Sequence, residues 1–343
     1  MNQRQWETLL AVLEGQLVSP LPVGFIIDSP WLPAWHGVSI LDYYADPHCW
    51  FQANLHACNT FPEILFLPGF WAEYGMCSEP ASLGTRCTFY ENDLPFAHPL
   101  QDALNEITEK PDPAVDGLAP LLLHRLCSWR PKIEEEGQAI RFAVARGPLN
   151  IASFLLGISE FLMALRMYPE KVHALLRIIT DFLLDWLRLQ KEKIDSIDGI
   201  FILDDIVGFL GAPDYEEFAH AYLGELFSAF PASVRFFHND AEGLICAPYL
   251  PALGVNLFNF SHLHSIAEMQ ALTGGKVTLL GNIAPLETLA QGSPADVKLA
   301  VTELIQGLES PHHLILSCGG GMAPGVPTEN INAFLAAAQE GQF

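Results

Sequence analysis

Short, almost uninterrupted hydrophobic runs recur along the chain, and each ends at a glycine, a proline or a polar residue. Runs of this kind are typical of strands that are buried on both faces, as in a parallel sheet. The pattern predicts eight strands, whose runs close at Asp28, Gly69, Pro148, Asp205, Asp240, Ser261, Ile283 and Gly321.

Segments with helical periodicity separate most of these runs, for example residues 169–193, 213–230 and 294–308. Pro169, Pro213 and Pro294 stand at or near their starts, where a missing N–H costs nothing. Strands that alternate with helices indicate an α/β fold. We therefore expect a single (β/α)8 TIM barrel over residues 1–343, with residues 1–17 forming an additional N-terminal amphipathic helix packed against it.

The interval between the second and third runs breaks this alternation, because about seventy residues, 70–139, separate them. We predict a long insertion between strands 2 and 3 that covers the mouth of the barrel. Its first aromatic residues, Phe70, Trp71 and Tyr74, are expected to line the mouth near Glu73 and Glu79. The alternative is that these rings only pack the loop onto the barrel.

The charge balance narrows the possible partners. The chain has 17 Lys and Arg against 40 Asp and Glu, a formal net charge of −23. Nucleic acid and anionic membrane surfaces are therefore excluded as partners, and a polyanionic substrate is disfavoured. The chain shows no signal-peptide pattern and no apolar stretch of roughly 18 residues. Seven cysteines without CxxC spacing suit reduced thiols, so we expect a cytoplasmic protein that acts on a small molecule.

Polar side chains gather where the predicted strands end. In a parallel barrel these ends share one rim, so the side chains should converge on one cavity. The candidates are Asp28, Asp204, Asp205, His238, Asn239, Asp240, Asn259, Asn282, Ser317 and Cys318. Because side chains alternate along a strand, only one of Asp204 and Asp205 can face the cavity, and the other should serve the following turn. Mutual proximity should raise the pKa of whichever carboxylate is more buried, leaving it able to donate a hydrogen bond or proton. Any single Asp or Asn could instead cap the next helix.

The triplet His238-Asn239-Asp240 is the most specific of these clusters. Amide and carboxylate groups together suit a flat heterocycle with alternating hydrogen-bond donors and acceptors. The last predicted loop carries three consecutive glycines, Gly319 to Gly321. They would let backbone approach a ligand closely; the alternative is that they only permit a tight turn.

Several segments resemble the uroporphyrinogen decarboxylase superfamily. They are GPLNIAS (147–153), DDIVGFLGAPDYEEFAHAYL (204–223), FFHND (236–240), GVNLFNF, LLGNIAPLETLAQGSP and the closing GGGMAPGVPTENI. The resemblance covers nearly the whole chain. It implies a TIM barrel with its site at the mouth, and an activity found either in the decarboxylase or in the corrinoid-dependent methyltransferases of the superfamily.

Departures from the decarboxylase pattern disfavour that activity. The decarboxylase grips an octacarboxylate with an arginine-rich loop after the first strand and has a GHG element in the last loop. This chain has DSPWLPAWHG and three glycines at those places, and no Lys or Arg between Arg4 and Arg86. Burying substrate carboxylates without cationic partners would cost roughly several kcal/mol each.

The thiol-alkylating methyltransferases of the superfamily hold zinc with an HxC pair and a second cysteine in the last loop. Here His238 matches, but Asp240 replaces the first cysteine and Gly320 aligns with the second. Cys318 lies two residues earlier, so a zinc site of His238, Asp240 and Cys318 is an alternative.

The sequence more closely resembles a zinc-free branch, which transfers a methyl group from a corrinoid protein to tetrahydrofolate and also shows HND followed by GGG. This resemblance implies a methyltransferase that uses methylcobalamin on a partner corrinoid protein, tetrahydrofolate as acceptor and no metal. It implies catalytic roles for Asp240, His238 and Asp204, and substrate binding by Asn239, Asp205, Asn259, Asn282, Asp28, Glu79 and Trp71. A zinc-dependent methyl-corrinoid:thiol methyltransferase, a decarboxylase and a non-catalytic binding protein remain alternatives.

Overall fold

The computed structural model describes residues 1–241 and 244–341. Every predicted hydrophobic run contains a strand, so all eight strand predictions are confirmed. The strands are β1 (Gly24–Ile26), β2 (Leu65–Leu67), β5 (Phe142–Arg146), β6 (Gly199–Leu203), β7 (Val234–Asn239), β8 (Leu257–Phe260), β9 (Thr278–Ile283) and β10 (Leu314–Cys318).

These strands follow one another in a parallel arrangement. Strands β5 to β10 form a six-stranded sheet in sequence order, and β1 pairs with β2. A single parallel bridge between Val23 and Leu316 joins β1 to β10. The α/β fold with a parallel sheet is confirmed.

One seam interrupts the hydrogen bonding that a fully closed barrel would have. Within the described ranges, no backbone hydrogen bond links β2 to β5. Side chains satisfy the free edge of β5 instead. Gln190 accepts from the N–H of Val144 at 3.0 Å and donates to its carbonyl at 3.0 Å, and Glu79 accepts from the N–H of Arg146 at 3.0 Å. We call this arrangement the open barrel.

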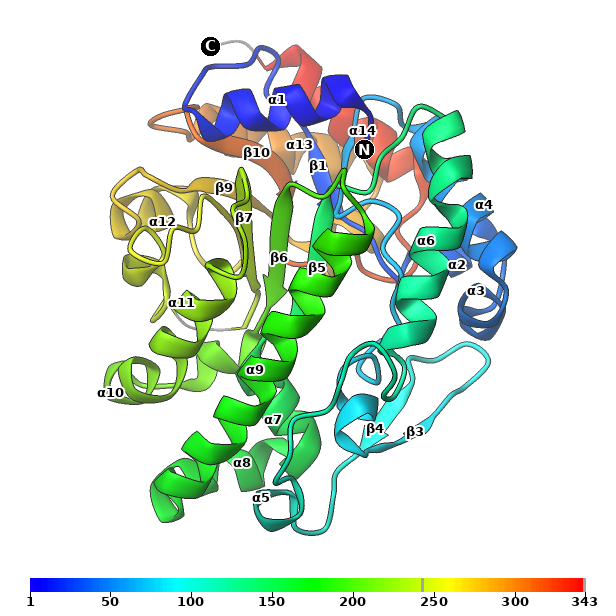
Figure 1. Cartoon of the computed structure of the whole chain (residues 1–343). Coiled ribbons are helices and arrows are strands. Elements are labelled where there is room, and N and C mark those ends of the chain that lie inside the picture. The colour runs from blue at the N-terminus through cyan, green and yellow to red at the C-terminus, as the bar shows by residue number, and fades with distance from the viewer. Residues whose placement is uncertain (242–243, 342–343) are drawn as a thin grey trace.

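Alternation along the strands separates two hydrophobic cores. The inner core includes Ile26, Leu65, Leu67, Phe142, Phe201, Phe236, Leu257, Leu280 and Ile315. Helix α1 (Gln3–Leu13) contributes Trp6, Leu9 and Val12 to the same cluster. It lies across the end of the barrel where the strands begin, so the predicted N-terminal helix is confirmed (Figure 1). The opposite end, where the strands finish, is the mouth.

Helices cover the outer faces of the strands through a second, larger core. The predicted helix at 169–193 is α9 (Pro169–Lys193), and the one at 294–308 is α13 (Pro294–Gln306). The segment predicted at 213–230 is divided into α10 (Ala212–Tyr215), the π-helix η3 (Glu216–His220) and α11 (Ala221–Phe227). The remaining helices are α2 (Leu32–His36), α3 (Ile40–Ala45), α4 (Pro47–Thr60), α7 (Pro148–Leu156), α8 (Ile158–Met167), α12 (Ile266–Leu272), α14 (Thr328–Glu340), η2 (Asp205–Phe209), η4 (Ala247–Tyr249) and η5 (Pro285–Ala290).

The insertion at residues 70–139 has secondary structure of its own. It contains η1 (Pro80–Leu83), α5 (Ala103–Glu106), α6 (Ala119–Glu135) and an antiparallel pair, β3 (Arg86–Thr88) and β4 (Phe96–His98). This strand pair was not predicted from the sequence. It lies beside α6 toward the mouth end of the molecule (Figure 1). Only the start of the insertion, residues 70–79, reaches the polar side chains of the inner wall through Glu73 and Glu79.

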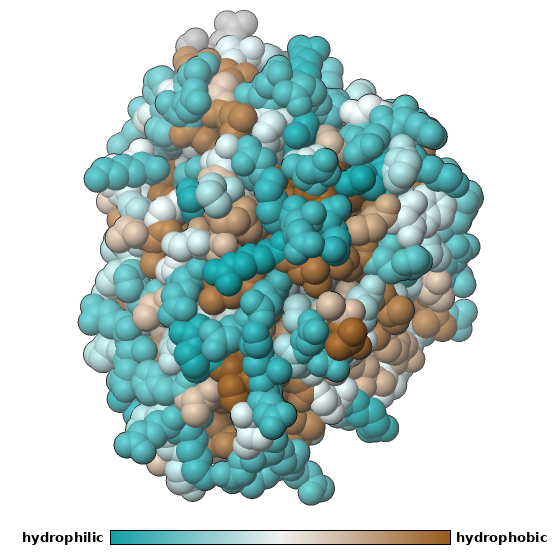
Figure 2. Space-filling model, viewed as in Figure 1, coloured by the Kyte–Doolittle hydropathy of each residue, from teal (hydrophilic) through white to brown (hydrophobic). Residues whose placement is uncertain are grey.

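The surface seen in Figure 2 is mostly hydrophilic, with separate hydrophobic patches. In the described part of the chain, no single helix has the length and hydropathy needed to cross a membrane. The pair α7 and α8 meets the criterion together by length and composition, but it is bent by 105°.

Candidate functional site

At the mouth of the open barrel, a layer of polar side chains lies directly above the apolar side chains of the inner core. Arg146 follows the inward-facing Val144 by two positions, and His238 and Asn259 follow Phe236 and Leu257 in the same way, so they share the inner face. The rings of Phe201 and Phe236 stack at 4.2 Å in the floor. At this height β5, β7 and β8 thus change from apolar to polar side chains, whereas β6 and β9 keep Leu203 and Leu280.

Asn259 fixes the orientation of the His238 ring. Its amide nitrogen donates to the carbonyls of Leu280 at 2.8 Å and Cys318 at 3.2 Å. Its Oδ1 must therefore accept, and it lies 2.8 Å from Nδ1 of His238. This network assigns the proton to Nδ1 and leaves Nε2 directed toward the mouth. Because Asn259 is fully buried and its polar atoms are engaged, it positions His238 and does not face a substrate.

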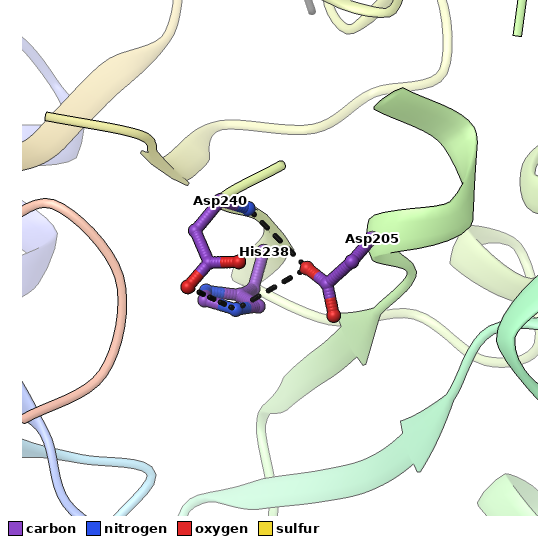
Figure 3. A group of neighbouring side chains, drawn as sticks. All are labelled: Asp205, His238 and Asp240. Carbon is purple, nitrogen blue, oxygen red and sulfur yellow. Dashed lines mark hydrogen bonds and ion pairs between the residues drawn. The ribbon is translucent and has the colours of Figure 1, made fainter. Parts of the chain in front are cut away.

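Two carboxylates face Nε2 of His238 (Figure 3). Oδ1 of Asp205 lies 3.5 Å from Nε2, and Oδ2 of Asp240 lies 3.7 Å from it. The backbone N–H of Asp240 also donates to Oδ1 of Asp205 at 3.3 Å. Burial raises the pKa of Asp240, and the Asp205 carboxylate adds to this rise while His238 opposes it. We call these three residues the open cluster, because the Asp205 and Asp240 side chains are 36% and 43% exposed.

Asp204 has a different environment from its neighbour. It is fully buried, and its two oxygens accept from the N–H groups of Leu149 at 2.9 Å and Asn150 at 3.0 Å, in the first turn of α7. Burial raises its pKa, and these two hydrogen bonds act in the opposite direction. A Cβ on Gly147 would lie 2.2 Å from its Oδ2, so only glycine fits there. The two side chains point different ways, as predicted, but Asp204 serves the start of α7 after β5 and not the turn that follows its own strand. The predicted catalytic role of Asp204 does not fit this position.

Two further predicted residues face away from the mouth. The buried Asn239 accepts from the N–H of Ala241 at 3.1 Å and donates toward Sγ of Cys246 at 3.5 Å. Cys318 is fully buried in the outer core, where its Sγ lies 3.4 Å from the carbonyl of Gly320. The predicted substrate contact of Asn239 and the zinc set with Cys318 are therefore wrong, because strand alternation turns both side chains outward.

Asn282, near the end of β9, and the glycine loop that follows β10 lie on this side of the mouth. Asn282 donates to the carbonyl of His264 and braces the loop that follows β8. Its predicted place in a common cavity with His238 stays a prediction. Gly320 has φ +101°, and a Cβ there would lie 2.5 Å from Oδ2 of Asp240. The glycine loop therefore approaches a carboxylate of the open cluster closely.

A second group of charged side chains, which we call the closed cluster, consists of Glu73, Glu79 and Arg146. Nη2 of Arg146 lies 3.1 Å from Glu73, and its Nη1 lies 3.3 Å from Glu79. The three side chains are only 11%, 3% and 6% exposed, in the order Arg146, Glu73 and Glu79. Although burial disfavours the guanidinium charge, Glu79 and Glu73 outweigh it and raise the pKa of Arg146.

From the sequence, Glu79 was predicted to bind the substrate, and Arg146 was not identified as a site residue. The structure ties Glu79 to Arg146 through both of its carboxylate oxygens, so it braces β5 instead. The signal for Arg146 was its position two residues after Val144 on an inward-facing register. Glu73 is held further by Ser29, whose N–H and hydroxyl donate to its Oε1 at 3.2 and 2.7 Å.

The aromatic residues at the start of the insertion divide between the two alternatives. Trp71 packs edge-on against Phe201 at 6.0 Å and lies 5.9 Å from the guanidinium of Arg146, at the inner wall. Phe70 packs instead against Trp50 and Phe51 of α4. Trp71 also lines a cavity at the seam of about 20 Å³, together with Glu79, Phe142, Val144, Arg146 and Gln190. That volume suits about one water molecule and not a substrate.

Asp28 follows the end of β1 by two residues, and its carboxylate interacts electrostatically with members of both clusters. Burial raises its pKa well above the ordinary range, and the Glu73 carboxylate adds to the rise. Arg146 opposes this effect and Asp240 adds to it, so Asp28 senses charges from both clusters.

Comparisons with known proteins agree on one family. The family described as Uroporphyrinogen decarboxylase (URO-D) matches residues 4–341. The chain is 26% identical over 175 residues to the uroporphyrinogen decarboxylase of Christiangramia forsetii, covering 51% of this chain and 50% of that protein. It is 24% identical over 230 residues to a methylated-thiol--coenzyme M methyltransferase of Methanosarcina mazei, covering 65% and 59%. These alignments thus span only about half to three fifths of the curated relatives.

A solved structure of a methyltransferase from Methanosarcina mazei superimposes on the chain with a TM-score of 0.77. The match covers 97% of both chains at 20% sequence identity. At that identity the likeness shows a shared fold and no more.

Proposed function

The chain belongs to the uroporphyrinogen decarboxylase family, whose members are methyltransferases or decarboxylases, and from this premise we propose that it is a corrinoid-dependent methyltransferase. The proposed reaction moves a methyl group between methylcobalamin on a partner corrinoid protein and tetrahydrofolate. The observation that carries the proposal is the open cluster: two partly exposed carboxylates beside an oriented imidazole, at the mouth and next to the glycine loop.

The closed cluster argues against decarboxylation of a polycarboxylate. Arg146, the guanidinium on the inner wall of the described strands, already pairs with Glu73 and Glu79. Arg125 is also buried, donating to the carbonyl of Tyr44 and the hydroxyl of Tyr74. On the described inner wall, a substrate with several carboxylates would thus meet acidic groups and a guanidinium that is already paired, which is unfavourable in a partly desolvated site.

The open cluster offers what an amine acceptor needs. The corrinoid would supply an electrophilic methyl group and keep the electron pair of the carbon–cobalt bond that breaks. When the lone pair of the pterin N5 takes that methyl group, the proton on N5 must leave, and Asp240 or Asp205 can accept it. The raised pKa of Asp240 suits this transfer because it brings the carboxylate nearer to neutral pH. Asn259 fixes the His238 ring so that Nε2 and both carboxylates lie together at the mouth. The remaining rate acceleration would come from holding the two reactants in the right orientation.

The rim of the mouth is suited to a protein partner. Phe209, Leu263 and Leu286 are 60%, 61% and 44% exposed, and they stand on the segments that follow β6, β8 and β9. Exposed apolar side chains arranged around a polar site indicate an interaction surface. We assign this rim to the corrinoid protein, which must bring its cofactor over the mouth.

A second candidate function is zinc-dependent methylation of a thiol. Ligand atoms of Asp205, His238 and Asp240 all lie within 4.8 Å of one another, as a metal site would require. Imidazole and carboxylate ligands suit zinc, and the bond from Nδ1 of His238 to Asn259 is the support that metal-bound histidines usually have. Zinc bound there would lower the pKa of a thiol acceptor. In this candidate zinc site the third ligand would be Asp205, in place of Cys318, which the sequence had suggested.

One assay separates these functions. The purified protein is given free methylcobalamin with either tetrahydrofolate or 2-mercaptoethanesulfonate, with and without added zinc or a chelator. We expect methylation of tetrahydrofolate that survives chelation and falls at least tenfold in Asp240→Asn. The matched control is Asp93→Asn, an exposed carboxylate in the insertion, which should behave as wild type. Methylation of the thiol alone, with stoichiometric zinc, would establish the second candidate instead.

A further inference from the structure

Asp28 has a carboxylate oxygen that no other protein group satisfies. It follows the inward-facing Ile26 by two positions, so its side chain points into the barrel. Its Oδ1 is shielded from solvent and has no hydrogen-bond partner in the described residues. A buried polar atom without a partner is unfavourable, so native proteins keep few of them, and those in a site commonly await a ligand.

Among the described residues, the cation that acts on Asp28 is already engaged elsewhere. The nearest guanidinium, on Arg146, already pairs with Glu73 and Glu79, so three carboxyl groups share one positive charge. The titratable groups that interact electrostatically with Asp28 come from several elements: Arg146 on β5, Glu73 after β2, Asp240 after β7, Tyr43 and Tyr44 on α3, and Cys318 from the outer side of β10. Among them the carboxylates disfavour a further negative charge.

The neighbouring strand also carries a buried hydroxyl near Asp28. Ser317 on β10 is fully buried and follows Ile315 of the inner core by two positions, so it faces the inside of the barrel. In the described residues, the partner of its Oγ is the weakly polar thiol of Cys318, and it makes no other hydrogen bond. The interior beside Asp28 thus holds a second oxygen that a ligand can engage.

We propose that Asp28 is an uncharged carboxylic acid in the resting protein and donates its O–H to the substrate. The acceptor is a carbonyl oxygen or ring nitrogen of a neutral heterocycle, because the carboxylates of Glu73 and Asp240 nearby repel an anionic group. This inference rests on the proposed function and sharpens it. The lactam edge of a pterin offers such acceptors, whereas a polycarboxylate does not.

The first test needs no substrate. The infrared difference spectrum between wild type and Asp28→Asn at pH 7 should contain the carbonyl band of a protonated carboxyl group. The control pair, wild type and Asp93→Asn, should lack it. If the band is absent from the Asp28 difference spectrum, Asp28 is ionised and the proposal is overturned, whatever the protein binds.

The second test measures tetrahydrofolate affinity by calorimetry. Asp28→Asn keeps a neutral N–H donor and should bind within about threefold of wild type, whereas Asp28→Ala should lose about tenfold, the equivalent of one hydrogen bond. Equal losses in both variants would show that a charge is needed, and wild-type affinity in Asp28→Ala would show that Asp28 does not touch the ligand. Either result overturns the proposal. Thermal unfolding of Asp28→Asn checks that it folds.

The two tests also separate this inference from the proposed function. If the infrared band is present but wild type does not bind tetrahydrofolate, the proposed function and the pterin assignment fail together. The uncharged state of Asp28 then stands on its own result.

Discussion

The open and closed clusters lie at the same end of the barrel but differ in how their charge is balanced. In the closed cluster, Glu73 and Glu79 are almost fully buried and both pair with Arg146. In the open cluster, Asp205 and Asp240 are more than a third exposed, and only an imidazole stands beside them. The first arrangement satisfies its own polar atoms, and the second leaves carboxylate oxygens available to a ligand.

This difference indicates which charged residues hold the structure and which serve chemistry. A buried carboxylate without a partner is so unfavourable that residues such as Glu73 must be paired for the fold to persist. A partly exposed carboxylate keeps its water shell and can exchange it for a substrate. Removing charge from the closed cluster should therefore affect stability, and removing charge from the open cluster should affect activity.

The largest effect is expected for Arg146→Met. The variant leaves two buried carboxylates without their cation, so the free energy of unfolding should fall by about 3–5 kcal/mol. Urea denaturation measures this change. The control is Arg166→Met, whose side chain is 70% exposed beside Asp214 and should matter by less than about 1 kcal/mol. If the two variants lose equal stability, the closed cluster is not a structural ion pair.

Asp204→Asn should give the next largest effect. An amide in place of the carboxylate sets one NH2 group against the N–H groups of Leu149 or Asn150, so one buried hydrogen bond is lost. We expect a loss of about 1–3 kcal/mol in stability, whereas Asp205→Asn should leave stability nearly unchanged and reduce methyl transfer. An Asp204→Asn variant that is fully stable yet inactive would restore the catalytic role first predicted for Asp204.

Much of the fold follows from local pattern. The eight strands and α1 come from hydrophobic periodicity, which depends on near neighbours in sequence. The same alternation that separated Asp204 from Asp205 also separates His238 from Asn239 and Ser317 from Cys318. Applied to every strand, it would have excluded Asn239 and Cys318 from the site. The inward-facing set was thus available from the sequence.

The contacts within the closed cluster could not be predicted from the local sequence pattern. Glu73 and Glu79 meet Arg146 only because residues 70–79 fold back over the seam beside β5. That placement depends on packing between distant segments, and no local pattern in the insertion encodes it. The β3–β4 pair was missed for a different reason: β1 and β2 are equally short but lie in continuous hydrophobic runs, whereas β3 and β4 are partly exposed and include Arg86, Thr88 and His98.

A glycine variant tests how closely the last loop approaches the open cluster. Gly320→Ala should cost about 1–2 kcal/mol, because φ is +101° there, and its Cβ would displace Asp240. Gly325→Ala is a matched control: its φ is +83°, but nothing lies within 4 Å of the added Cβ. Both variants should lose similar stability in thermal unfolding, and only Gly320→Ala should lose methyl transfer. Equal activity in the two would show that the loop does not constrain Asp240.

The smallest effect on stability is expected for Asp240→Asn, and its sign depends on pH. Burial raises the pKa of Asp240 in the folded protein, so folding favours the protonated form. The stability that this provides is complete below the unfolded pKa, about 3.9, and is lost as pH rises through the folded pKa. The Asn variant does not titrate, so it should match wild type near pH 3 and be slightly more stable at pH 8. The difference should stay under about 0.5 kcal/mol because the side chain is 43% exposed. Thermal unfolding from pH 3 to 8 measures it, and methyl transfer measured at pH 7 should fall at least tenfold in the same variant. A variant that is less stable than wild type at pH 8 would mean that the Asp240 charge supports the fold, and the distinction between the two clusters would fail.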